Sequence, residues 1–492
     1  MPFILAISIP SNPIVGLAIA GILFGIGRPI ILRVSYAEKN PWLVRVLTIS
    51  LLLHLLAAPL QIWVVDHFYN GIADWLRYDN QGSSLASSYR HFDFSVPGKR
   101  LVGDGMVSAI AASVFAIIGV NQVGAFLIFS FGAWLGLLFF YRAFSLTFAG
   151  ANHRRYAILL FFLPSLIFWT ADVSKEAIMT LSLGLAAFGA AKILARQRGG
   201  FVLLIIGGAL GAVVRPNELL LLLAGFCIAL LILPAGPRRT LGGIRRVGSI
   251  AFLLVLLGVA VYLTEHFLRS SGGSFSLQQI STTDKGSAAS GAGFGSSNVS
   301  YSPGPQGFLH DVFTVLLDPL GYNAHGNGER LASVENLVVL GVILSSWRQL
   351  RIVVRASFAR PYVLLCGIYS LGFMYTFAAL GNLGLITRER TLLFPFLLVV
   401  LSIPRSPKGE EPQFDWELRR GERLRRRRVG ESVTPMPTLA GLPSAPRPRP
   451  RMFRPTSLPI REPVRASAGP APPGDPSADP GSPTSDPPPP TD

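Results

Sequence analysis

The chain has 492 residues, of which 50% are hydrophobic and only 14% charged, whereas a soluble domain carries about a quarter charged residues. The formal net charge is +17, but the Lys and Arg residues lie in short stretches between apolar runs, which argues against a nucleic-acid partner. The pattern excludes an ordinary soluble protein. It predicts an all-α, polytopic transmembrane protein of the plasma membrane, with about ten to twelve crossings.

Apolar runs recur from the N-terminal region to residue 404. They cover residues 12–32, 44–65, 123–147, 157–171, 177–195, 201–214, 217–233, 248–267, 332–347, 361–380 and 391–404. Several are shorter than the ~20 residues that an upright membrane helix needs, which indicates half-length or paired helices around a buried cavity. Residues 1–404 are therefore predicted to form one multi-pass transmembrane domain.

Basic residues in alternate loops predict the orientation of the helices, because such loops stay in the cytoplasm. The loops that should be cytoplasmic carry Arg33, Lys39 and Arg45; Arg154 and Arg155; Arg196 and Arg198; Arg238, Arg239, Arg245 and Arg246; and Arg348, Arg351, Arg355 and Arg360. Two long loops, 66–105 and 268–306, then face outward, as do short turns at 172–176, 215–218 and 382–390. The loops can alternate between the two sides in this way only if residues 106–119 do not cross the membrane, so they are predicted to form a helix at the outer interface.

The C-terminal segment, residues 405–492, has a different composition. It is rich in Pro, Arg, Ser and Asp and ends in a run of prolines, so it is predicted to be a disordered cytoplasmic tail. Its basic run, residues 419–428, could contact anionic lipid or could only fix the topology. Its Pro-rich stretches could bind cytoplasmic proteins.

An acid in the first outward loop is the main candidate for catalysis. Asp74 lies soon after a predicted crossing and is flanked by Trp75, Arg77 and Tyr78. A carboxylate held at the membrane surface can act as a general base. The alternative is a solvated loop acid without a catalytic role.

A second candidate is Lys175, in the turn before the run 177–195. Capping explains the neighbouring acids, with Ser174 or Asp172 as the N-cap and Glu176 in the first helical turn. A lysine at a helix N-terminus opposes the helix dipole, so Lys175 could instead meet an anionic group of a ligand.

Three arginines lie at the outer boundary of apolar segments, where an unpaired charge is costly. Arg215 could form an ion pair with Glu218, or it could bind a ligand. Arg388 and Arg390 precede the last apolar run, and a planar guanidinium suits a phosphate group. No His or Cys spacing indicates a metal site, and Cys227 and Cys366 lie far apart in separate apolar runs.

Five segments carry a family resemblance and cover patches of residues 65–404. In chain order they are ADWLRYDNQG, FLIFSFGAWLGLLFFYRAF, RRYAILLFFLPSLIFWTADVSKEAIMTLSLGLAAFGAAKIL, VVRPN and GNLGLITRERTLLFPFLLV. These segments resemble a family of actinobacterial polytopic membrane proteins that is itself similar to the GT-C glycosyltransferases, which use polyprenyl-phosphate sugars.

The resemblance implies a transfer of a hexose or pentose from a polyprenyl-phosphate donor to a glycan or lipid acceptor outside the cell. In that reaction Asp74, assisted by Asp79, would be the base. The cations that would bind the donor phosphate are Lys175, Arg215, Arg388 and Arg390. The chain has Asp79 and Asn217 where that family usually has histidines, which leaves the acceptor contacts and a requirement for a divalent metal ion open.

Two other classes of protein fit the sequence. A transporter, flippase or polymerase of lipid-linked glycans would also need cations near the outer boundary, although inverted repeats of the kind found in transporters are not evident. A membrane scaffold that binds cytoplasmic proteins through its tail would not need arginines at the outer boundary.

Overall fold

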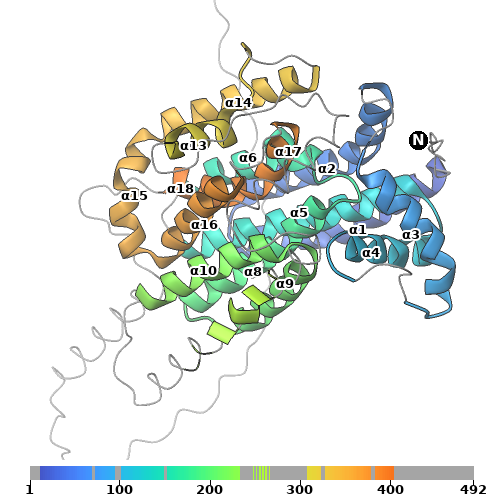
Figure 1. Cartoon of the computed structure of the whole chain (residues 1–492), viewed down its shortest axis with the longest axis horizontal. Helices are drawn as coiled ribbons and strands as arrows, with labels where there is room; N and C mark the ends of the chain where they lie inside the picture. The colour runs from blue at the N-terminus through green and yellow to red at the C-terminus, as the bar shows by residue number, and fades with distance from the viewer. Residues whose placement is uncertain are drawn as a thin grey trace, which may run out of the picture. The chain divides into compact units, whose positions relative to one another are not determined.

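The computed structural model describes residues 12–68, 73–94, 101–148, 152–232, 307–322, 327–377 and 383–403, with isolated residues between 248 and 265. These residues form α-helices and one short 3-10 helix, and no strand occurs among them (Figure 1). The predicted all-α fold is confirmed. The loop 268–306 and the tail 405–492 lie outside the described residues, as does most of the run 248–267.

Most of the helices follow the predicted apolar runs. The helices over residues 75–90, 308–317, 347–359 and 383–389 were not predicted, and the first of them lies within the predicted outward loop 66–105. In chain order, the helices are α1 (Pro13–Ala37), α2 (Pro41–Phe68), α3 (Trp75–Arg90), α4 (Asp104–Ile118), α5 (Gln122–Thr147), α6 (His153–Phe162), α7 (Pro164–Phe168), α8 (Lys175–Leu194), α9 (Gly200–Val214), α10 (Pro216–Ile232), α13 (Phe308–Leu317), α14 (Asn327–Ser345), α15 (Trp347–Ala359), α16 (Pro361–Phe377), α17 (Leu383–Glu389), η1 (Arg390–Leu392, the 3-10 helix) and α18 (Phe394–Leu401). Five of them begin at a proline, a residue that lacks an N–H and has a φ angle suited to the first helical position.

Four helices in the described ranges are long and apolar enough to cross a membrane: α1, α2, α5 and α8. A fifth candidate is α14 together with α15, which are bent by 61° at their junction. The other apolar helices have 10–17 residues: α4, α9, α10, α13 and α16. Full-length candidates are thus fewer than the predicted number of crossings, because several predicted runs form helices of 17 residues or fewer and most of the run 248–267 lies outside the described residues.

Breaks at defined residues produce these short helices. The predicted run 157–171 is divided between α6 and α7, since Pro164 cannot continue the preceding helix. Arg215 separates α9 from α10 because it precedes Pro216, and a residue before proline avoids the helical conformation. Both breaks expose helix ends, and the next section shows which charged side chains gather there.

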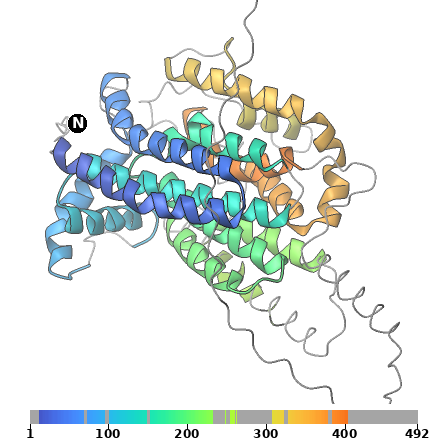
Figure 2. The same cartoon turned by 180° about the vertical axis from the view of Figure 1, so that it is seen from behind.

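Helix α5 forms the centre of the packing. It contacts α1 and α2 on one side and α8 on the other, and α8 in turn packs on α9 (Figures 1 and 2). A second pair, α10 and α16, lies beside α8, while α3 and α4 pack on each other. The residues predicted to lie at the outer interface, 106–119, form most of α4, which packs mainly on the short helix α3 and also contacts α5 and α9.

Two glycines allow α5 and α8 to approach closely. A Cβ atom on Gly136 would lie 2.3 Å from the carbonyl oxygen of Thr180, and one on Gly184 would lie 2.3 Å from the carbonyl oxygen of Gly136. Both contacts are with backbone atoms, which cannot move aside as a side-chain end can. Small residues at such crossings let membrane helices pack backbone to backbone.

We expect Gly136→Ala to lower the free energy of unfolding by about 1–3 kcal/mol or more, because the methyl group would force α5 and α8 apart. The matched control is Gly132→Ala on the same helix, where the nearest atom to a Cβ is Leu181 Cδ2 at 3.9 Å. Thermal unfolding of both variants in one detergent measures the difference. Equal losses in the two variants would contradict this account of the contact.

Candidate functional site

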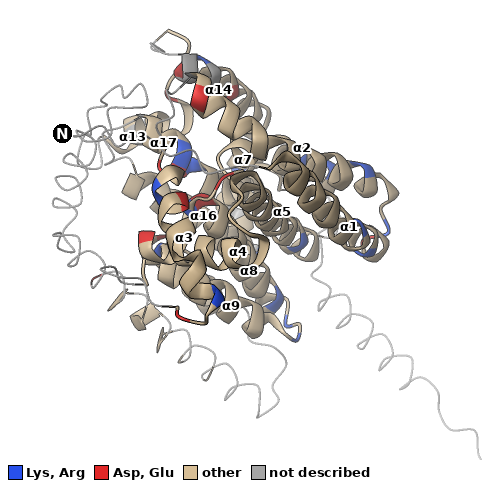
Figure 3. Ribbon diagram, turned by 90° about the vertical axis from the view of Figure 1, so that its right-hand side faces the viewer, with Lys and Arg blue, Asp and Glu red and all other residues tan. Residues whose placement is uncertain are grey.

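Ion pairs join the ends of several helices in two sets, one around Asp104 and one around Arg215 and Arg388. The two sets adjoin at the consecutive residues Lys175 and Glu176 and are here named together the acid–base cluster. Its members are Asp74, Arg77, Asp104, Lys175, Glu176, Arg215, Glu218, Arg388 and Glu389. Acidic and basic positions adjoin one another beside α17, as Figure 3 shows. Three of the predicted cations and the predicted base belong to this cluster, although they come from four separate parts of the sequence.

Arg215 lies at the buried side of the acid–base cluster. Its guanidinium donates to Glu176 at 2.7 Å, to Glu218 at 2.8 Å and to Glu389 at 2.6 Å. The carboxylate-bearing side chains of Glu176 and Glu218 are fully buried. The Arg215–Glu218 ion pair considered from the sequence is present, and Arg215 is bound by two further acids, so it is a tether between α8, α10 and α17.

Arg388 links the buried acids to the exposed base candidate. Its Nη1 donates to Asp74 Oδ2 at 2.7 Å, and its Nη2 donates to Glu176 Oε2 at 2.6 Å. Burial acts to lower the pKa of Arg388, but the nearby acids Glu176, Asp172 and Asp74 outweigh it and raise that pKa. The guanidinium therefore keeps its charge, and it holds an Asp74 side chain that is 64% exposed.

Lys175 meets an acid of the chain itself. Its Nζ lies 2.5 Å from Asp104 Oδ1, and Asp104 also pairs with Arg77 and accepts a hydrogen bond from the Tyr78 hydroxyl at 3.1 Å. Burial acts to raise the pKa of Asp104, but Lys175 and Arg77 outweigh it and lower that pKa. Ser174 is the N-cap of α8, accepting from the Ala177 N–H at 3.3 Å.

The start of α4 is tied to the end of α9, which explains how Asp104 reaches Lys175. The Gly103 N–H donates to the carbonyl oxygen of Val213 at 2.8 Å. Gly103 has a φ angle of 61°, a conformation that glycine adopts without the steric cost of a Cβ. This contact fixes Asp104, the first residue of α4, beside the N-terminus of α8.

Asp79 does not lie on the exposed side of the acid–base cluster. Its side chain is fully buried on α3, and neither carboxylate oxygen has a hydrogen-bond partner among the described residues. Burial raises its pKa well above the ordinary value, with a further upward effect from Asp172, while the nearby Gln122 side chain acts in the opposite direction. Asp172 is itself buried, and burial raises its pKa to about 6. Asp79 and Asp172 are thus two buried acids whose pKa values are both raised by burial.

We expect the folded protein to lose stability as the pH rises, in part because of Asp79. A raised pKa means that the folded state binds more protons than the unfolded state between the two pKa values, so each ionisation above the ordinary pKa destabilises the fold. Each such group gives a slope of up to ~1.4 kcal/mol per pH unit. Asp79→Asn should flatten the decline, as measured by chemical unfolding from about pH 5 to about pH 8. Parallel curves for wild type and variant would contradict this expectation.

Arg390 is placed apart from the acid–base cluster. It is fully buried, and its Nη1 faces the carbonyl oxygens of Leu316 at 3.5 Å and Asp318 at 3.3 Å, at the end of α13. Arg390 is the first residue of η1, and the preceding Glu389 pairs with Arg215 instead. Arg388 and Arg390, which the sequence analysis treated as one pair, therefore have different neighbours.

Only one acidic partner of the candidate cations was predicted from the sequence, Glu218 for Arg215, and the other ion pairs were not predicted. The cluster contains four basic and five acidic side chains, so the predicted cations are compensated by acids of the chain. One signal was available: Lys175 and Arg388 are each followed directly by a glutamate.

Within the part of the chain that the structure describes, no group of three or more His, Cys, Asp or Glu side chains is arranged to hold a metal ion. Comparisons of this chain with protein-family models, with curated proteins and with solved structures find no match.

Proposed function

We propose that this protein is a membrane glycosyltransferase of the GT-C type, which moves a sugar from a polyprenyl-phosphate donor to an acceptor outside the cell. The observation that carries the proposal is the exposed Asp74 carboxylate, held by Arg388 at the edge of the acid–base cluster. The acid–base cluster thus has an accessible acid beside fixed cations at the ends of apolar helices, where the anionic group of a lipid-linked sugar would lie. The family resemblance described above supports the same reaction.

In the proposed reaction Asp74 is the general base. An acceptor hydroxyl attacks the anomeric carbon of the sugar, and its proton passes to the Asp74 carboxylate. The bond between the anomeric carbon and the phosphate oxygen breaks, and its electron pair stays on that oxygen. Attack and departure occur on opposite faces of the sugar, so the configuration at the anomeric carbon is inverted. The ion pair with Arg388 orients the carboxylate for this step.

The departing polyprenyl phosphate needs positive charge where its negative charge develops. Lys175 and Arg388 are partly exposed, at 21% and 16% of their side-chain surface, and Arg77 is 56% exposed. A phosphate group would replace Asp104 as the partner of Lys175 and Arg77. Arg215 would act as a positioning residue, because it binds Glu176 and so holds that carboxylate in place for Arg388.

The test is a transfer assay with purified full-length protein in nanodiscs and a panel of polyprenyl-phosphate sugars. The expected product is a glycosylated acceptor with inverted anomeric configuration, identified by mass spectrometry and nuclear magnetic resonance, together with free polyprenyl phosphate. Failure of every donor with folded protein would argue against the proposal, and a product of retained configuration would argue against Asp74 as a base in a single displacement.

A transporter of lipid-linked glycans or of protons is the second candidate, and the buried polar residues favour it. Asp79, Asp172 and Gln61 each have a buried oxygen atom without a hydrogen-bond partner among the described residues. Buried ionisable residues among membrane helices often mark a route for ions or substrates. Proton uptake by proteoliposomes that is lost in Asp172→Asn, in the absence of any sugar transfer, would favour this candidate.

A further inference from the structure

Helix α15 differs from the other helices in having a strongly two-sided, basic sequence. Its residues, WRQLRIVVRASFA, contain three arginines and no acidic residue. With 13 residues it spans about 20 Å at the ~1.5 Å rise per residue of an α-helix, too short to cross a bilayer upright. The helix must therefore lie at an angle to its neighbour or along a membrane surface.

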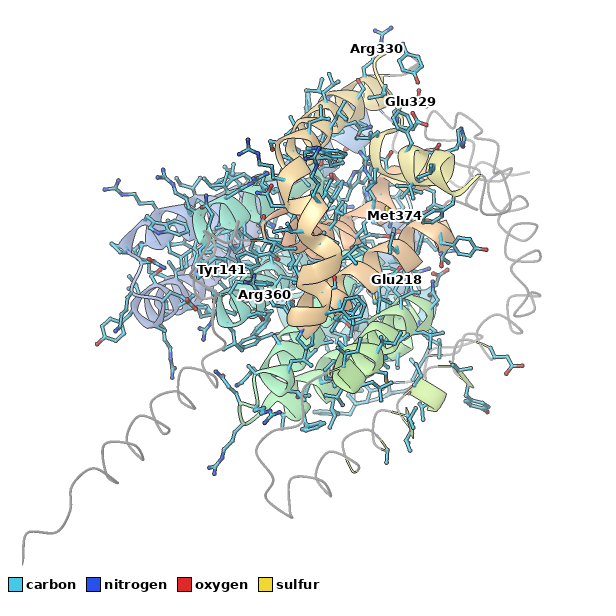
Figure 4. All side chains as sticks on the ribbon, turned by 90° about the vertical axis from the view of Figure 1, so that its left-hand side faces the viewer. Tyr141, Glu218, Glu329, Arg330, Arg360 and Met374 are labelled. Atoms are coloured by element: carbon cyan, nitrogen blue, oxygen red, sulfur yellow. The ribbon has the colours of Figure 1, made fainter. Side chains whose placement is uncertain are left out.

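The junction between α14 and α15 is fixed by Arg155 of α6. Its Nη2 donates to the Ser346 hydroxyl at 2.6 Å and to the Ser345 hydroxyl at 3.0 Å. These serines lie where the chain turns by 61°. At the other end of α15, the Arg360 guanidinium lies over the Phe148 ring, 5.4 Å from its centre. Figure 4 labels Arg360 at this end of the helix. Both ends of α15 are held by contacts with other parts of the fold, so its direction is set by the structure.

The exposed face of α15 has an apolar strip beside a basic strip. Trp347, Val354 and Phe358 are 56%, 67% and 65% exposed, and their spacing of seven and then four residues places them on one line along the helix. Arg348 and Arg351 are also exposed. At about 100° per residue they lie to one side of that line. The Arg351 guanidinium stacks over the Trp347 ring at 4.9 Å, which joins the two strips.

We propose that this face of α15 lies in the plane of the membrane surface and binds the headgroups of anionic phospholipids. The apolar strip would enter the acyl boundary, and the arginines would reach the phosphate groups of the same lipids. The absence of acidic residues from α15 gives the face charge complementarity to an anionic leaflet. Burial of the same arginines in hydrocarbon would be costly, so the pair α14 and α15 is a broken element whose second half leaves the hydrocarbon. This inference does not depend on the proposed enzymatic reaction.

The position of the face can be tested with spin labels in full-length protein. Cys227 and Cys366 are the two cysteines of the sequence, so alanine at both gives a background for Val354→Cys and, separately, Arg348→Cys. In nanodiscs the label at position 354 should be more accessible to oxygen, which dissolves in acyl chains, and the label at 348 more accessible to a water-soluble nickel complex. Two labels that both favour oxygen, or both favour nickel, would overturn the in-plane placement.

Lipid selectivity provides a second test that keeps both native cysteines. Protein is extracted from equimolar phosphatidylglycerol and phosphatidylcholine, and the retained lipids are counted by native mass spectrometry. Since each arginine near an anionic surface contributes roughly a fivefold preference, Arg348→Gln with Arg351→Gln should lower the phosphatidylglycerol preference on the order of 25-fold.

The matched control is Arg33→Gln with Arg45→Gln, which removes the same charge from exposed positions on α1 and α2. It should keep most of the wild-type preference. If both double variants lost the same amount of phosphatidylglycerol preference, the preference would depend on the net charge of the protein and not on α15, which would overturn the proposal. Wild-type protein without a preference for phosphatidylglycerol would overturn it as well.

Discussion

The Asp74→Asn variant is expected to transfer sugar about 10²- to 10⁴-fold more slowly than wild type, the range that a positioned general base contributes. An amide keeps the size of the carboxylate and can still accept from Arg388, but it cannot take the acceptor proton. The loss should therefore fall on the turnover rate rather than on the Michaelis constant of the donor, because the missing interaction is made in the transition state. Initial rates at several donor concentrations measure both quantities.

The matched control for this variant is Asp66→Asn. Asp66 is an exposed acid near the end of α2, and it has no place in the proposed reaction. The Asp66→Asn variant should therefore transfer sugar at the wild-type rate. If Asp74→Asn also retained that rate, Asp74 would not be the base, whatever the reaction proved to be.

The second large effect is expected for Glu176→Gln, which should lower the free energy of unfolding by about 3–5 kcal/mol, as is usual when one partner of a buried ion pair is removed. Glu176 is fully buried and binds both Arg215 and Arg388. A neutral amide would leave these two guanidinium groups short of negative charge in a poorly solvated place. Chemical unfolding in a mild detergent measures the loss.

Glu38→Gln is the control for this effect. Glu38 pairs with Arg142 at 3.4 Å, and the Arg142 side chain is 32% exposed, so its removal should cost about 1 kcal/mol or less. A Glu176→Gln variant as stable as Glu38→Gln would mean that the acid–base cluster does not hold α8, α9 and α17 together.

Much of the fold could be predicted from the sequence because it rests on local signals. Long apolar runs mark helices regardless of their partners. The positions of α5 and α8 were predicted to within two residues on this basis. The break at Pro164 was not predicted, because 157–171 was treated as one run. The pairing of α3 with α4 was not predicted, because it depends on which surfaces fit and not on hydropathy.

The candidate site could be predicted only in part. Residue type and position at the ends of apolar runs singled out Asp74, Lys175, Arg215 and Arg388, and the structure brings these four into one cluster. Their partners could not be predicted, since Arg215 and Glu389 are 174 residues apart and Arg388 and Glu176 are 212 residues apart. Such pairs depend on tertiary packing that no local pattern records.

Arg390 illustrates the limit of reasoning from spacing alone. It stands two residues from Arg388 in a short segment, so both arginines were predicted to bind one phosphate. The 3-10 turn that begins at Arg390 instead places it against the carbonyl oxygens at the end of α13. A role for Arg390 in donor binding remains a prediction of the family resemblance, and the geometry of the cluster does not add to it.

The central claim is that the acid–base cluster at Asp74 catalyses transfer from a lipid-linked sugar. The most direct measurement is the release of polyprenyl phosphate from labelled donors by wild-type protein in nanodiscs, with Asp74→Asn beside it. The account predicts release that requires both acceptor and wild-type protein and that falls by at least about a hundredfold in the variant. Release at equal rates by both proteins, or no release from any donor by folded wild-type protein, would contradict it.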